Sequence, residues 1–97
     1  MPKAYWVAAY HSIDDEKKFS AYIKLASPAI AKGGGTFLTR GVASKAYENG
    51  ILARTTIIVF ETLGAAIATH DGPDYQLALA ALDNGVTRDL RFVEGLE

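Results

Sequence analysis

The sequence contains no cysteine, and this absence excludes several kinds of chemistry at once. A chain without thiols forms no disulfide, offers no thiolate to zinc or to an iron–sulfur cluster, and has no cysteine nucleophile. It has only two histidines, His11 and His70, far apart and in neither an HxH nor an HExxH pattern. We therefore expect no metal site and no bound cofactor.

Long apolar runs are also missing. No stretch approaches the length of a membrane-spanning helix, and Met1-Pro2-Lys3-Ala4 does not lead into the hydrophobic segment of a secretory leader. The net charge is -1, with acidic and basic residues interspersed, so no basic surface for nucleic acid stands out. We expect a cytoplasmic protein that binds neither membranes nor nucleic acids.

The composition is that of a folded globular chain. Hydrophobic residues make up 49% and charged residues 22% of 97 residues, which excludes a disordered chain. This length suits one domain with one core, so residues 1–97 are interpreted as a single domain.

Local patterns predict four strands, at residues 4–11, 36–41, 54–61 and 88–94. Asn49-Gly50 is a strong hairpin signal, and we expect residues 47–48 and 51–52 to extend the strands around it. In the last strand, Leu90 and Phe92 should lie on one side, with Asp89, Arg91 and Val93 on the other.

Two helical segments separate these strands. The first begins at Asp14 or Asp15 as N-cap and ends at residues 33–35, and Pro28 should kink or restart it. The second begins after Thr62, and residues 71–74 (DGPD) should break and restart it, since Gly72 can make a left-handed exit and Pro73 suits a first turn.

The resulting order is β-α-β-β-α-β, the ferredoxin-like α+β plait, with a four-stranded antiparallel sheet and its helices on one face. The first and third strands, which are apolar on both sides, should occupy the middle. The face without helices would then expose Trp6 or Val7, and Ile57 or Ile58. Exposed apolar sheet surface of this kind predicts a homodimer in which two such faces meet.

Five segments carry a resemblance to a known family. They are residues 1–8 (MPKAYWVA), 34–41 (GGTFLTRG), 57–61 (IIVFE), 71–76 (DGPDYQ) and 93–95 (VEG). In this combination and order, over essentially the whole chain, they are similar to domain of unknown function 1330. The resemblance implies the dimeric α/β-barrel group, whose relatives include small cofactorless monooxygenases, isomerases and stress-response proteins. His70 and Gly72 depart from the family's usual aromatic and serine, which argues against a role for an aromatic hydroxyl there.

Arg40 and Arg54 are candidate ligand-binding residues. Arg40 ends a strand beside Gly41, where its guanidinium would point into a pocket and hold a carboxylate in bidentate fashion. The alternative for each arginine is a salt bridge at the sheet, with Glu61 a candidate partner.

His70 is the candidate general base, because histidine titrates near neutral pH. The alternative is a partly buried histidine with one hydrogen bond. Trp6, Tyr22 and Tyr75 are candidate ligand-binding residues that would line a cavity between helices and sheet; the alternative is that they are ordinary core residues.

The resulting hypothesis is a homodimer that binds a small organic molecule between sheet and helices. If it is an enzyme, proton transfer or cofactor-free oxidation would use His70 as base and Arg40 to stabilise an oxyanion. A second hypothesis is a non-catalytic binding or stress-associated dimer whose pocket is filled by side chains. A third is a structural interaction module with apolar patches outside the dimer face.

Overall fold

The computed structural model describes residues 2–96. Within them, strands and helices follow one another in this order: β1 (Ala4–Ile13), α1 (Glu16–Lys32), β2 (Thr36–Val42), β3 (Arg54–Phe60), α2 (Leu63–Asp71), α3 (Pro73–Leu82) and β4 (Val86–Glu94). The predicted β-α-β-β-α-β order is confirmed, with the second helical segment split in two.

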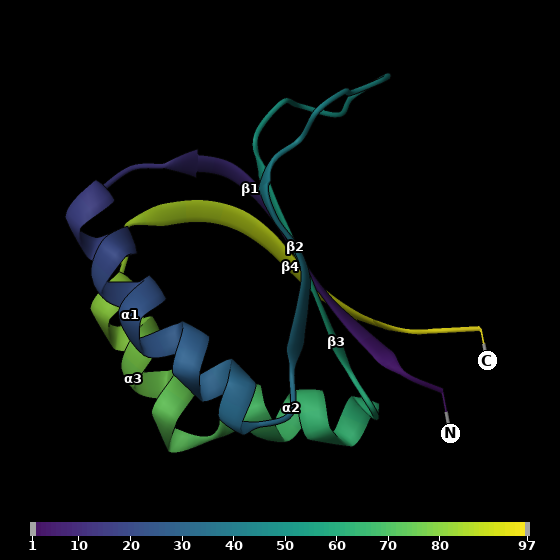
Figure 1. The fold of residues 1–97 in the computed structure, drawn as a ribbon. Helices are drawn as coiled ribbons and strands as arrows, with labels where there is room; N and C mark the ends of the chain where they lie inside the picture. Colours follow the sequence, from purple (N-terminus) through teal and green to yellow (C-terminus); the bar gives the residue numbers. More distant parts are fainter. Residues whose placement is uncertain (1, 97) are drawn as a thin grey trace.

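The strands form one antiparallel sheet in the order β2-β3-β1-β4, and the helices lie on one side of it (Figure 1). This is the ferredoxin-like fold, and β1 and β3 occupy its centre as predicted. In the register, Trp6 of β1 lies opposite Ile58 of β3 and Phe92 of β4. Their side chains therefore share the face that the helices cover.

Strand alternation divides the sheet into a covered face and an open face. Trp6 and Ile58 are only 1% and 2% exposed beneath the helices. Their neighbours in the sequence, Val7 and Ile57, point to the open face, where both are half-buried. The sequence left open which member of each pair would be uncovered, and the structure assigns Val7 and Ile57.

Side-chain caps begin two of the helices, as predicted. The Asp15 carboxylate accepts a hydrogen bond from the Lys18 amide at 3.0 Å.

The predicted restart at Pro28 is wrong, because α1 continues through it to Lys32. Pro28 and Lys24 both lie on the exposed side of α1, where water can satisfy the Lys24 carbonyl that Pro28 leaves without a donor.

The break between α2 and α3 is confirmed, although its geometry differs from the prediction. Thr62 caps α2 by accepting from the Ala65 amide at 3.1 Å. Gly72 has extended dihedrals, with φ -73° and ψ 163°, rather than a left-handed conformation. Pro73 is the first residue of α3, where its missing amide hydrogen costs no helical bond.

Residues 43–53 form a hairpin loop that projects beyond the sheet (Figure 1). The predicted strand extensions beside Asn49-Gly50 are wrong. The loop contains a turn in which the Gly50 amide donates a hydrogen bond to the Tyr47 carbonyl at 2.9 Å. Glu48 in this turn has a positive φ of 54°. The loop lies outside the area that neighbouring strands or helices cover, and Tyr47 is 75% exposed.

The two ends of the described chain lie close together, at the end of the sheet opposite this loop (Figure 1). The Gly95 amide donates a hydrogen bond to the Lys3 carbonyl at 2.7 Å. No helix among residues 2–96 combines the length and apolar character needed to cross a membrane.

Candidate functional site

A guanidinium group and three phenol groups, each from a different element, meet between the helices and the sheet. Arg88 Nη1 donates to the hydroxyls of Tyr10 at 2.9 Å and Tyr22 at 3.2 Å, and Arg88 Nη2 donates to that of Tyr75 at 3.3 Å. The Tyr22 and Tyr75 hydroxyl oxygens lie 2.7 Å apart. These four residues, the Arg88–tyrosine cluster, are joined by hydrogen bonds within a mainly apolar interior.

The charge of this cluster follows from its surroundings. Burial raises the pKa of Tyr75 above its ordinary value of 10.0, and burial also raises that of Tyr10. Burial opposes the charge of Arg88, but the neighbouring hydroxyls of Tyr22 and Tyr75 outweigh it, and the pKa of Arg88 is raised. At neutral pH, Arg88 is therefore positive while Tyr10 and Tyr75 are neutral.

Arg54 and Arg40 extend the positive charge along the covered face of the sheet. The Arg54 guanidinium carbon lies 5.0 Å from the centre of the Phe19 ring, and its buried Nε atom has no hydrogen-bond partner. The Arg40 guanidinium stacks 4.5 Å above the Phe37 ring, and its Nη1 donates to Ser27 Oγ at 3.3 Å. Within residues 2–96, neither of these arginines makes an ion pair.

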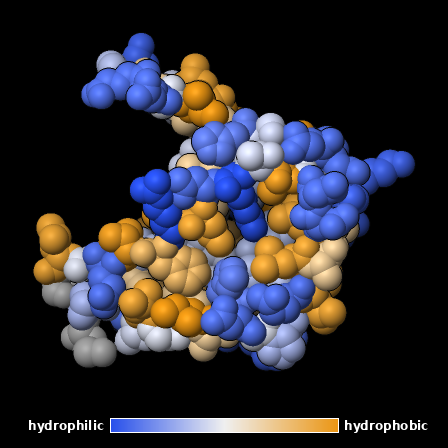
Figure 2. Space-filling view, turned by 180° about the vertical axis from the view of Figure 1, so that it is seen from behind, coloured by the Kyte–Doolittle hydropathy of each residue, from blue (hydrophilic) through white to orange (hydrophobic). Residues whose placement is uncertain are grey.

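A cavity of about 20 Å³ lies beside the cluster, between α1 and the sheet. Its lining includes Trp6, Tyr22, Ala26, Arg40 and Arg88. A space of this size suits about a single water molecule. Seen from the side opposite to Figure 1, the surface has a hollow whose rim combines strongly hydrophilic and hydrophobic side chains (Figure 2).

His70 lies in a different depression, between α2 and β4. That groove, of about 240 Å³, is lined by Ile67, His70, Asp71, Leu90 and Phe92. His70 Nδ1 lies 2.9 Å from Asp71 Oδ1, and its side chain is 28% exposed. The arrangement is that of a partly buried histidine with one hydrogen-bond partner.

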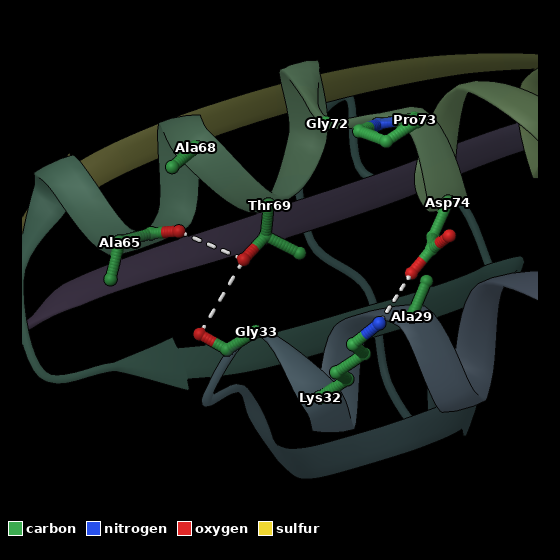
Figure 3. Close-up of a pocket in the computed structure, with 9 residues that line it drawn as sticks. All are labelled: Ala29, Lys32, Gly33, Ala65, Ala68, Thr69, Gly72, Pro73 and Asp74. Atoms are coloured by element: carbon green, nitrogen blue, oxygen red, sulfur yellow. Dashed lines mark hydrogen bonds and ion pairs between the residues drawn. The ribbon is translucent and has the colours of Figure 1, made fainter.

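A larger depression, of about 310 Å³, lies where α1, α2 and α3 meet (Figure 3). Thr69 Oγ1 donates to the Ala65 carbonyl at 2.9 Å, and Lys32 Nζ lies 3.3 Å from Asp74 Oδ2. A Cβ atom on Gly33 would overlap the Thr69 side chain, so glycine is required for this approach. The polar groups drawn here are bonded to one another, which identifies a helix junction rather than a ligand site.

The structure does not bring all the predicted site residues together. Trp6, Tyr22 and Arg40 line the small cavity, and Tyr75 joins them through its hydroxyl. His70 does not line that cavity, and Arg40 does not line the groove of His70. Arg54 also lies outside the cavity lining, next to it, with its guanidinium beside Tyr10 and Phe19.

Sequence reasoning did not select Arg88 or Tyr10. A signal was available for Arg88, because strand alternation places it on the same face as Leu90 and Phe92. An arginine on the inward face of a strand needs partners in the interior, and Tyr10 is one of them.

The family model described as Domain of unknown function (DUF1330) matches residues 3–96. The chain belongs to this family. Among curated proteins, none matches this DUF1330 chain.

Solved structures similar to this DUF1330 protein agree on its fold. A protein of unknown function from Rhodopseudomonas palustris has a TM-score of 0.77 and 13% identity, covering 99% of this chain and 84% of that one. A dimeric ferredoxin-like protein of unknown function from Jannaschia sp. CCS1 has a TM-score of 0.68 and 13% identity, covering 96% and 99%. SnoaB, a cofactor-independent oxygenase from Streptomyces nogalater, has a TM-score of 0.63 and 14% identity, covering 100% and 96%. At this identity the likeness establishes the ferredoxin-like fold.

Proposed function

We propose that this protein is a homodimer that binds a small organic molecule in the compartment between α1 and the covered face of the sheet. The observation that carries the proposal is the cavity beside Arg88, in which polar donors and aromatic rings converge. Ligand sites combine an apolar wall with a few polar groups that fix orientation. Here Trp6 supplies part of the wall, and Arg40 and Arg88 supply the polar groups.

Arg40 gives this compartment a way to open. Its guanidinium bridges from β2 to Ser27 of α1 through a hydrogen bond of 3.3 Å. Arg40 is exposed, so water can replace that bond at little cost. Movement of Arg40 away from Phe37 would enlarge the cavity beyond the space of a water molecule and give a ligand access from the β2 edge.

The open sheet face supports the dimer. Val7, Ile57 and Val59 lie on the two central strands and are half-buried in the single chain. A second copy would cover them, because an apolar face of this kind favours self-association about a two-fold axis. The similar Jannaschia protein is described as dimeric, which agrees with this arrangement.

A catalytic version of the proposal, cofactor-free proton transfer or oxidation, assigns the base to His70 and oxyanion stabilisation to Arg40. It requires a substrate that extends past Trp6 and Tyr75, since the ring of His70 lies 5.7 Å and 5.1 Å from theirs but outside the cavity lining. Binding needs no such extension, and it is therefore the function that the geometry supports best.

The alternative is a non-catalytic dimer with no open pocket, and the small cavity volume favours it. Native mass spectrometry of the purified protein distinguishes the two. A copurifying small molecule should appear with the wild type and with Ala21→Val on the exposed side of α1. It should be lost in Ala26→Val, which fills the cavity wall. Absence of any such molecule from all three proteins, or its retention in Ala26→Val, would support the closed alternative.

Light scattering after size-exclusion chromatography tests the dimer. Ile57→Asp places a carboxylate on the open face and should produce monomers. Ala21→Asp, which adds the same charge on the exposed side of α1, should leave the dimer intact. A wild-type protein that is monomeric at high concentration would refute the dimer.

A further inference from the structure

We propose that the ligand of this compartment is an organic carboxylate, whose oxygens accept hydrogen bonds from Arg88, Arg54 and tyrosine hydroxyls. This inference rests on the proposed function and adds the charge and chemical class of the ligand. Three observations carry it: the cluster contains hydroxyl hydrogens with no acceptor, its positive charges have no acidic partner, and its walls are aromatic.

The donor surplus follows from counting the hydroxyl hydrogens. Tyr10, Tyr22 and Tyr75 each have one, and the bond between the Tyr22 and Tyr75 oxygens uses one of these three. Two hydroxyl hydrogens are then left without an acceptor among the hydrogen bonds of residues 2–96, because Arg88 only donates. The buried Nε–H of Arg54, whose guanidinium lies beside Tyr10 at the edge of the cavity lining, is a further unmatched donor. Unsatisfied buried donors are costly, so the site calls for a ligand that accepts.

The charge surplus appears when Arg88 is compared with Arg91 on the same strand. Arg91, which points to the opposite face, is neutralised by two-pronged contacts with Asp89, at 2.9 Å from both Nε and Nη2. The hydrogen-bond partners of Arg88 are tyrosine hydroxyls instead. The Arg54 and Arg88 guanidinium carbons lie 5.9 Å and 5.4 Å from the centre of the Tyr10 ring. Two positive charges therefore lie near one phenol, and neither forms an ion pair within residues 2–96.

Tyr10 and Tyr75 cannot supply the missing negative charge. Burial raises the pKa of Tyr10 and of Tyr75 above the ordinary value, which keeps both phenols protonated at neutral pH. A water molecule in the cavity would satisfy hydroxyl hydrogens but would leave the charges of Arg54 and Arg88 uncompensated. A carboxylate satisfies both requirements, because it accepts several hydrogen bonds and pairs with guanidinium groups.

The cavity lining favours an apolar body attached to that carboxylate. Trp6, Tyr22, Phe37 and Ile58 surround the space beside Arg88 and Arg40. Flat or apolar groups pack well against such rings. Inorganic anions lack this part and should bind more weakly than an organic acid of the same charge.

Matched acid and amide probes test the inference. The pairs benzoate with benzamide and hexanoate with hexanamide differ in charge but scarcely in shape. Trp6 is the one tryptophan of the chain and lines the cavity, so its fluorescence reports binding directly. We expect each acid to bind at least about tenfold more tightly than its amide, since charge-assisted hydrogen bonds exceed neutral ones by this much or more.

Two variants test whether Arg54 and Arg88 bind the carboxylate. Arg54→Gln should weaken benzoate binding about tenfold or more, whereas Lys24→Gln, which removes one exposed positive charge from α1, should not. Arg88→Lys retains the charge but loses the planar fork, and it should also weaken benzoate. Circular dichroism and thermal unfolding show whether each variant is folded. Arg54→Gln breaks no hydrogen bond of the structure, so it still tests the inference if Arg88→Lys does not fold.

The possible outcomes distinguish a failure of the carboxylate inference from a failure of the proposed function. If the amides bind as tightly as the acids, or Arg54→Gln binds benzoate like Lys24→Gln, the carboxylate inference is overturned while small-molecule binding stands. If none of the four probes changes Trp6 fluorescence, the compartment does not open to ligands of this size and the proposed function fails as well. Preference for the acids, lost in Arg54→Gln, supports both.

Discussion

Replacing Tyr75 with phenylalanine removes one hydroxyl from the Arg88–tyrosine cluster and leaves the volume of the core almost unchanged. Tyr75 is 0% exposed, and its hydroxyl bonds to that of Tyr22 at 2.7 Å and to Arg88 Nη2 at 3.3 Å. Net loss of a neutral hydrogen bond costs about 0.5–1.5 kcal/mol and of one to a charged group about 1.5–3 kcal/mol. The second bond is long, and Arg88 keeps two other acceptors, so we expect a total of about 2 kcal/mol.

Urea unfolding followed by Trp6 fluorescence measures this change, because Trp6 is 1% exposed and its ring lies 5.0 Å from that of Tyr75. Protein concentration is held constant, since dimerisation would couple to stability. Tyr47→Phe, at a 75% exposed position, is the control and should change stability by less than about 0.5 kcal/mol. In a thermal scan the Tyr75→Phe variant should melt about 8–16 °C lower. A Tyr75→Phe protein as stable as the Tyr47→Phe control would refute the view that this hydroxyl network supports the fold.

Three further predictions follow from the structure. Gly35→Ala should destabilise the protein by about 1–3 kcal/mol, because its Cβ would lie 2.6 Å from Ile30 Cγ2 and 2.7 Å from Phe60 Cζ. Gly41→Ala is the control in the same urea assay and should be near neutral, because no atom lies within 4 Å of its Cβ. The raised pKa of Tyr75 means that the folded state keeps a proton that the unfolded state loses. The contribution of Tyr75 to stability should therefore be constant below its ordinary pKa of 10.0 and should fall as pH rises above it. Tyr75→Phe should reduce the fall in stability above pH 10.0, and an unchanged alkaline profile would contradict the pKa shift. His70→Gln should leave benzoate affinity unchanged, because His70 lies outside the cavity of Arg40, and a tenfold loss in the fluorescence titration would instead favour the catalytic pairing of the two.

The element order and the central strands could be predicted because they depend on local pattern. Val7 and Ile57 belong to strands that are apolar on both sides, which identifies central strands but does not say which side the helices cover. That choice depends on where Tyr22 and Tyr75 pack, and thus on contacts between distant segments. The hairpin loop was mispredicted for a related reason: Asn49-Gly50 specifies a turn, but strands form beside it only where neighbours pack against them.

The candidate site was harder to predict than the fold. Arg40 and Tyr22 could be proposed from residue type and position, and the structure places both beside one cavity. Arg88 was missed because its importance comes from Tyr10, which is 78 residues away in the sequence and is brought opposite by the pairing of β1 with β4. Residue type alone cannot show that an arginine lacks an acidic partner, because this requires knowledge of every group around it.

The hydrogen bond between Lys3 and Gly95 makes the chain a candidate for circular permutation. A short glycine-rich linker should join the adjacent ends of residues 2–96, and a new start at residue 49 would cut the chain in the projecting loop, away from every strand pairing. In such a permutant β2 and β3 would no longer be neighbours in sequence, so their pairing would form late and slow folding while the native sheet stayed the same. Comparing its refolding rate with that of the parent would measure how much this hairpin accelerates folding.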